Sequence, residues 1–122
     1  MAENSYDCWI DIFELSHYRG RRRRLFGPNC FPEIRSHTAS WGINIDSLIV
    51  GPEAYVRFHN DADPINTILW LLPRQVVGDI VDLRIDDAVD SIQIFSKPPQ
   101  QGELGYAAYL ETMKLSKVQK NN

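Results

Sequence analysis

The chain has 122 residues, of which 43% are hydrophobic and 24% are charged, a composition typical of one ordinary globular domain. Sixteen acidic residues outnumber thirteen lysines and arginines, so the formal net charge is -3 and nucleic acid is not an expected partner. The basic charge is nevertheless segregated, because every lysine lies at or after Lys97 and the arginines concentrate between Arg19 and Arg24.

The sequence contains no apolar run long enough to span a membrane. The first residues, "MAENSYDCW", are polar and lack the apolar core of a secretory signal, so we expect a cytoplasmic protein. Without a secretory signal, Cys8 and Cys30 are expected to be reduced thiols rather than a disulfide.

Short apolar or alternating stretches, separated by turn residues, predict an all-β protein. The predicted strands are "WIDIF" (9–13), "SLIV" (47–50), "AYVRFH" (54–59), "TILWLL" (67–72) and "DSIQIF" (90–95). Strands of this length and spacing are typical of a β-sandwich, and its core is the expected place for Trp9, Trp41 and Trp70.

The β portion contains an internal repeat. "IDSLIV" (45–50) and "VDSIQI" (89–94) share one pattern and lie 44 residues apart. Phe13 and Phe58 each end a predicted strand and lie 45 residues apart. A repeat of this length holds about four short strands, the size of a Greek key.

This repeat divides the chain into three parts. The predicted parts are a tail (1–7), a domain (8–96) made of two units of about 8–51 and 52–96, and a linker with a C-terminal extension (97–122). Within the extension, residues 106–118 have the pattern of one amphipathic helix, with Tyr106, Tyr109, Leu110 and Met113 on one side.

The stretch "FELSHYRG" resembles the Greek key signature of the βγ-crystallin family, in which an aromatic ends the first strand and a second aromatic and a glycine follow in a folded hairpin. These three positions are matched by Phe13, Tyr18 and Gly20, and the family's serine at the start of the last strand is matched by Ser47 and Ser91. The resemblance implies a βγ-crystallin-like sandwich of two Greek keys. The second unit departs from it, because neither the aromatic nor the glycine follows Phe58.

The resemblance also implies calcium as a cofactor. Many members bind it through a motif N/D-N/D-x-x-S/T-S, and the corresponding windows here are "DDAVDS" (86–91) and "GINIDS" (42–47). Gly42 and Ile43 fail the two leading positions of the second of these windows.

In the family each calcium site is shared between the two units. Carried over, one site would combine the carbonyls of Glu14 and Asn44 with the side chains of Asp46 and Asp87. The other would combine the carbonyls of His59 and Ala88 with Asp90, but Ile43 leaves it a ligand short. We therefore expect one weak calcium site; the alternative is that the aspartates of "DDAVDS" form a solvated turn.

The run Arg21, Arg22, Arg23 and Arg24 is interpreted as part of a strand. Because alternate residues of a strand face opposite sides, the run does not present one patch. One interpretation is an edge strand whose cationic side chains prevent aggregation. The other is a surface that contacts an anionic partner.

No catalytic motif stands out. His17, His37 and His59 lack the spacing of a metal-binding HExxH motif, and no GxSxG sequence is present. We therefore expect a non-enzymatic structural or binding domain, weakly calcium-binding and capable of self-association. The alternatives are an interaction module that uses Arg21–Arg24, or a protein similar to the small toxins and inhibitors of the wider superfamily.

Overall fold

The structure is a computed structural model that describes residues 7–31, 45–59, 68–80 and 91–120. Its elements are β1 (Trp9–Leu15), β2 (Arg19–Phe26), β3 (Asn29–Phe31), β4 (Ser47–Val50), β5 (Tyr55–His59), β6 (Leu69–Leu71), β7 (Val76–Val77), β8 (Ser91–Phe95) and the helix α2 (Tyr106–Lys120). No helix in these ranges is long and apolar enough to cross a membrane.

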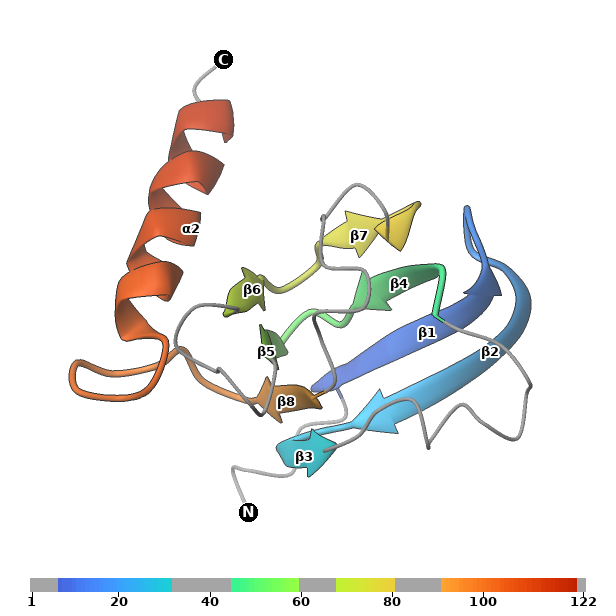
Figure 1. Cartoon of the computed structure of the whole chain (residues 1–122), viewed down its shortest axis with the longest axis horizontal. Helices are drawn as coiled ribbons and strands as arrows, with labels where there is room; N and C mark the ends of the chain where they lie inside the picture. The colour runs from blue at the N-terminus through green and yellow to red at the C-terminus, as the bar shows by residue number, and fades with distance from the viewer. Residues whose placement is uncertain (1–6, 32–44, 60–67, 81–90, 121–122) are drawn as a thin grey trace.

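The described strands form two antiparallel four-stranded sheets, with the order β2-β1-β4-β7 in the first sheet and β3-β8-β5-β6 in the second (Figure 1). Each sheet holds three strands of one unit and the third strand of the other, because β3 pairs with β8 and β7 pairs with β4. The predicted β-sandwich of two Greek keys is confirmed. The exchange of third strands makes each sheet incomplete without both units.

The core lies between the two sheets and is built by strand alternation. In β1, Ile10 and Ile12 are fully buried, and in β5, Val56 and Phe58 are 0% and 1% exposed. The other strands supply the remaining buried apolar side chains, namely Leu25, Leu48, Val50, Leu71, Val77, Ile92 and Ile94. Residues between these positions point to the outer faces of the sheets.

The register shows a difference between the two units that the sequence repeat conceals. Phe13 of β1 lies opposite Ser47, whereas the residue of β5 opposite Ser91 is His59. Phe58 therefore corresponds to Ile12 in the core and not to Phe13, so the alignment of the two phenylalanines is wrong by one residue. Such a slip moves a side chain to the other face of the sheet.

Trp9 and Trp70 lie outside the sandwich core, which corrects the prediction for these two. Trp70 is 1% exposed, but it packs on the outer face of the second sheet, where its Nε1 donates a hydrogen bond of 2.9 Å to the carbonyl of Gly105. Trp9 is half-buried on the outer face of the first sheet. Trp41 lies outside the described residues.

The C-terminal extension covers the outer face of the second sheet. The side chain of Arg57, which is 9% exposed, donates hydrogen bonds to the Leu104 carbonyl (2.9 Å) and to Gln93 Oε1 (2.7 Å). Burial lowers the pKa of Arg57. These contacts, together with the Trp70 bond, fasten the linker across the sheet before α2 begins.

The predicted helix is confirmed, and it rises away from the sandwich (Figure 1). Of its predicted apolar face, Tyr109 is buried, with its ring centroid 5.6 Å from that of Trp70 and 6.3 Å from that of Tyr55. Leu110 is 41% exposed, and Leu115 further along is 64% exposed. The helix is therefore attached chiefly through its first turn.

We predict that Tyr109→Ala destabilises the protein by about 3 kcal/mol, the low end for removing a buried aromatic ring. Thermal unfolding followed by tryptophan fluorescence measures the change, since Trp70 contacts the deleted ring. Leu115→Ala is the control on the same helix, and its exposed side chain should change stability by less than about 0.5 kcal/mol. Equal effects of the two substitutions would show that the extension is not held through Tyr109.

Candidate functional site

The turn between β1 and β2 is a hairpin folded over the first sheet. His17 and Tyr18 have positive φ angles of 59° and 61°, and Gly20 has a φ of 81°. The Tyr18 ring packs edge-on against Phe13, with centroids 5.8 Å apart and an interplanar angle of 76°. Phe13, Tyr18 and Gly20, which carry the sequence resemblance, are thus brought together in one local structure.

Ser47 fixes this hairpin to the first residue of β4. Its side chain is fully buried, and its Oγ donates a hydrogen bond of 2.6 Å to the Leu15 carbonyl and accepts one of 2.9 Å from the Tyr18 amide. The His17 amide donates to the Gly78 carbonyl at 2.6 Å, which ties the hairpin to the second unit. A single hydroxyl therefore satisfies one donor and one acceptor of the folded turn.

The hydrogen bonds of Ser47 also help to fix the positions of two predicted calcium ligands. The Asp46 amide donates a hydrogen bond of 3.0 Å to the Phe13 carbonyl, so Asp46 lies beside Glu14, the next residue of β1. We call Glu14 and Asp46 the calcium corner. The other two residues predicted for this site, Asn44 and Asp87, lie outside the described residues.

The two carboxylates of the calcium corner differ in their surroundings. Glu14 accepts a hydrogen bond of 2.8 Å from Arg21 Nε, and this bond holds the pKa of the Glu14 carboxyl below its usual value. Asp46 is half-buried, and no described residue forms a hydrogen bond or ion pair with its carboxylate. The side chain of Asp46 is thus available as an oxygen ligand, and Glu14 has its backbone carbonyl to offer.

The second predicted calcium site is largely outside the part that the structure describes, since Ala88 and Asp90 both fall there. His59 lies in β5, opposite Ser91. By this register the residue that corresponds to Glu14 is residue 60, also undescribed, and not His59. The second site stays a prediction.

The arginine run lies in β2, at the edge of the first sheet, as predicted. Arg24 grips Asp11 with two hydrogen bonds, from Nε to Oδ1 (2.7 Å) and from Nη2 to Oδ2 (2.9 Å), and these bonds raise the pKa of Arg24. Its guanidinium also lies 3.7 Å from the centre of the Trp9 ring. Asp11 is 4% exposed, so this clamp neutralises a buried carboxylate.

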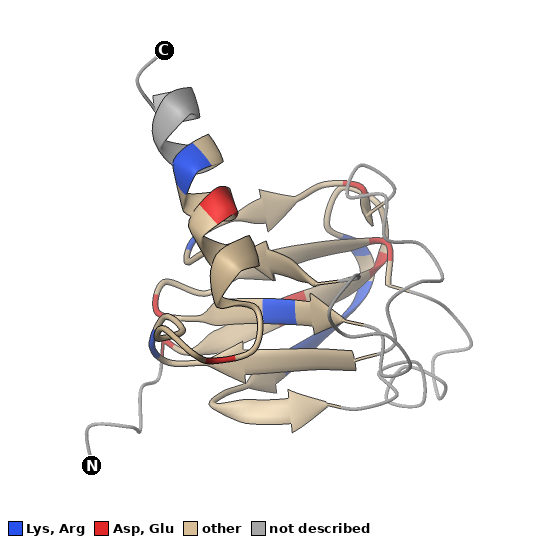
Figure 2. Ribbon diagram, turned by 60° about the vertical axis from the view of Figure 1, so that its left-hand side comes forward, with Lys and Arg blue, Asp and Glu red and all other residues tan. Residues whose placement is uncertain are grey.

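The remaining arginines are more exposed. Arg22 Nη1 lies 3.8 Å from Asp11, with 57% of its side chain exposed, and Arg21 pairs with Glu14 at 2.7 Å, with 54% exposed. Arg22 and Arg24 share the face of Asp11, as the predicted alternation requires. The β1–β2 ribbon thus carries five arginines against two carboxylates and is rich in basic residues, although the protein as a whole is acidic (Figure 2).

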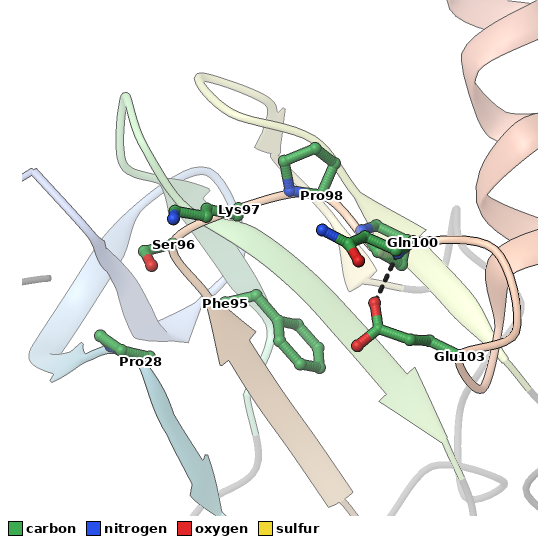
Figure 3. Close-up of a pocket in the computed structure, with 8 residues that line it drawn as sticks. Pro28, Phe95, Ser96, Lys97, Pro98, Gln100 and Glu103 are labelled. Atoms are coloured by element: carbon green, nitrogen blue, oxygen red, sulfur yellow. Dashed lines mark hydrogen bonds between the residues drawn. The ribbon is translucent and has the colours of Figure 1, made fainter.

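A shallow pocket lies beside the linker, where Pro28, Phe95, Lys97, Pro98 and Glu103 are among its lining residues (Figure 3). The Glu103 carboxylate there accepts a hydrogen bond from the Gln100 amide and so closes the linker turn. Within the described ranges, no three His, Cys, Asp or Glu side chains gather where they could hold a metal ion. The pocket is thus lined by proline and phenylalanine rings, by the polar residues Ser96, Lys97 and Gln100, and by one carboxylate that already accepts a hydrogen bond.

Comparison with known proteins gave matches among solved structures alone: no protein-family model and no curated protein matches the chain. A structure concerning the evolution of the eye lens βγ-crystallin domain fold matches with a TM-score of 0.60 and 19% identity, covering 77% of this chain and 91% of that one. A βγ-crystallin domain from Clostridium beijerinckii matches with a TM-score of 0.53 and 17% identity, covering 73% and 99%.

A third similar structure is the βγ-crystallin domain of the abundant perithecial protein of Neurospora crassa, solved in its Ca²⁺-bound form. The TM-score is 0.58 at 10% identity, with 80% of this chain and 98% of that chain covered. Together with the strand exchange and the folded hairpin, these matches show that the chain has the βγ-crystallin domain fold. The fold implied by the sequence resemblance is thereby confirmed.

Gly20 offers a direct test of the folded hairpin. A Cβ there would lie 2.8 Å from Glu14 Oε1 and 2.9 Å from Glu14 Cβ, in addition to the positive φ. We predict that Gly20→Ala costs about 2–3 kcal/mol, in the range of strained backbone. The control is Gly102→Ala, where φ is 94° but no atom lies within 4 Å, so about 1 kcal/mol is expected. Equal losses in thermal unfolding would contradict the crowding at Gly20.

The clamp on Asp11 predicts unequal roles for neighbouring arginines. Arg24→Ala should destabilise the protein by about 2–3 kcal/mol, because it leaves a buried carboxylate without its two hydrogen bonds. Arg22→Ala should cost less than about 1 kcal/mol, as expected for an exposed ion pair. Urea unfolding measures both variants. Recovery of stability on adding Asp11→Asn to Arg24→Ala would identify the unpaired charge as the cause, whereas a further loss would exclude it.

Proposed function

We propose that the chain is a non-enzymatic βγ-crystallin-like domain that binds one calcium ion weakly at the calcium corner and is stabilised by it. The observation that carries the proposal is the position of Asp46. Its amide is bonded to the Phe13 carbonyl, and its carboxylate is uncommitted among the described residues. The hairpin carbonyl of Glu14 and a half-buried carboxylate thus lie at one corner.

The chemistry of this corner suits calcium. Calcium takes hard oxygen ligands, both carboxylate and backbone carbonyl, in a flexible geometry. In the proposed site, Asp46 and Asp87 supply carboxylates, and Glu14 and Asn44 supply carbonyls. A bound cation offsets the repulsion between the two carboxylates.

The similar structures support this proposal without deciding it. The Neurospora crassa domain was solved in its Ca²⁺-bound form, so the fold is able to hold the ion. In this chain Gly42 and Ile43 stand at the two leading positions of the window 42–47, and Ile43 removes the side-chain ligand of the other site, so one site alone keeps its ligand set. We expect that site to be weak because the window also departs from the family motif at Asp46, which replaces serine or threonine.

The non-enzymatic part of the proposal rests on the sequence and the fold. The sequence has no HExxH or GxSxG motif, and the matched structures are βγ-crystallin domains. Two of the described carboxylates make structural contacts, with Asp11 held by Arg24 and Glu14 bonded to Arg21. We therefore infer a domain that acts through its surface and its stability.

We predict that calcium raises the melting temperature. Binding to the folded state alone stabilises by RT ln(1 + [L]/Kd), about 2.7 kcal/mol at a hundred times Kd. For a domain of this size each kcal/mol corresponds to roughly 4–8 °C. Asp46→Asn, which keeps the size of the side chain and removes its charge, should abolish most of the shift.

The matched control is Glu111→Gln, which removes one negative charge from an exposed side chain of α2. It should leave the calcium response unchanged. Magnesium should replace calcium poorly, because it demands tighter octahedral geometry. A melting temperature that does not move up to about 10 mM calcium, beyond the range of weak extracellular modules, would refute the site.

A further inference from the structure

We propose that β2 is a docking edge for an extended acidic peptide of a partner protein, which adds a strand to the first sheet beside β2. The inference is independent of calcium, because it uses the arginines of β2 rather than the predicted calcium ligands. It rests on the sheet order, on the exposure of the arginines and on the way in which β1 already binds them.

The first step is the geometry of the edge. β2 is the terminal strand in the order β2-β1-β4-β7, so among the described strands it has a neighbour on one side alone. It is eight residues long, and Leu25 is its one buried side chain. A long edge strand is a template for pairing with a further strand through backbone hydrogen bonds.

The second step is the charge on both faces of this edge. Arg22 and Arg24 lie on the outer face with Asp11, whereas Arg23 lies opposite Ile12 and therefore on the inner side of the sheet. A strand added beside β2 would meet guanidinium groups whichever way its side chains point. A run of acidic residues fits such an edge better than a pattern with one acidic face.

The third step is that β1 already provides an example of a carboxylate bound by an arginine of β2. Asp11 lies directly across from Arg24 and accepts hydrogen bonds from its Nε and Nη2. Residues on an added strand would stand at the same cross-strand spacing on the other side of β2. Arg22 approaches Asp11 no closer than 3.8 Å and is 57% exposed, so its donors remain available for a second carboxylate.

A peptide is favoured over nucleic acid for two reasons. The chain as a whole carries a charge of -3, which repels a long polyanion, whereas a short acidic segment meets the basic ribbon alone. A strand edge also alternates N–H donors with C=O acceptors, and an extended peptide matches both, whereas phosphate groups offer acceptors alone. Phe26, 56% exposed at the end of β2, adds an apolar contact for a side chain of the peptide.

The experiment measures binding of a fluorescent peptide of eight consecutive glutamates, which carries carboxylates on both faces when extended, to the full chain at low salt, in the presence of EDTA. We expect binding that weakens as salt increases. N-methylation of alternate backbone amides of the peptide, which keeps every charge, should abolish it. The chelator keeps the outcome separate from that of the calcium proposal.

Protein variants complete the test. Arg22→Gln should weaken binding roughly two- to fivefold, the range of an exposed ion pair. Lys114→Gln removes the same charge from α2, away from β2, and should leave binding unchanged. Absence of binding, equal affinity for the N-methylated peptide, or tighter binding of a single-stranded RNA of equal charge would each overturn the proposal.

Discussion

The structure depends on one buried hydroxyl, that of Ser47. By bonding the Leu15 carbonyl and the Tyr18 amide, it holds a hairpin with two left-handed residues that would otherwise be costly. The hairpin in turn places Phe13 under Tyr18, brings Glu14 beside Asp46 and lets β2 run back along β1 as an edge strand. The position of the calcium corner and the edge position of β2, which carries the arginines, therefore both depend on the hydrogen bonds of Ser47.

In the second sheet, the outer face is covered by the C-terminal extension. Arg57 and Trp70 carry polar groups into this buried layer, and the linker carbonyls of Leu104 and Gly105 accept their hydrogen bonds. Tyr109 then closes the aromatic cluster. The extension acts as a third layer of the domain, because without it the Trp70 indole N–H would lose its partner and the Arg57 guanidinium would keep its bond to Gln93 alone.

Neighbouring arginines of the run in β2 have different roles in the structure. Arg24 has a structural role, since its charge compensates the Asp11 carboxylate, which is 4% exposed. Arg22 lies farther from Asp11, and 57% of its side chain is exposed to water. The sequence predicted the edge position and the alternation. It did not predict the clamp, because Asp11 and Arg24 are 13 residues apart and meet through the register of β1 and β2 alone.

By itself the sequence determined the two-unit β-sandwich and the helical extension, because alternation, the repeat and apolar periodicity are local signals, and the resemblance of "FELSHYRG" to the βγ-crystallin signature implied the folded hairpin. The tertiary structure decided which strands are exchanged between the sheets, and it placed Trp70 under the extension. It also showed that His59, not Phe58, lies opposite Ser91. These features depend on pairing between residues far apart in the chain, and a one-residue change of register leaves the local pattern almost unaltered while reversing the face of every side chain.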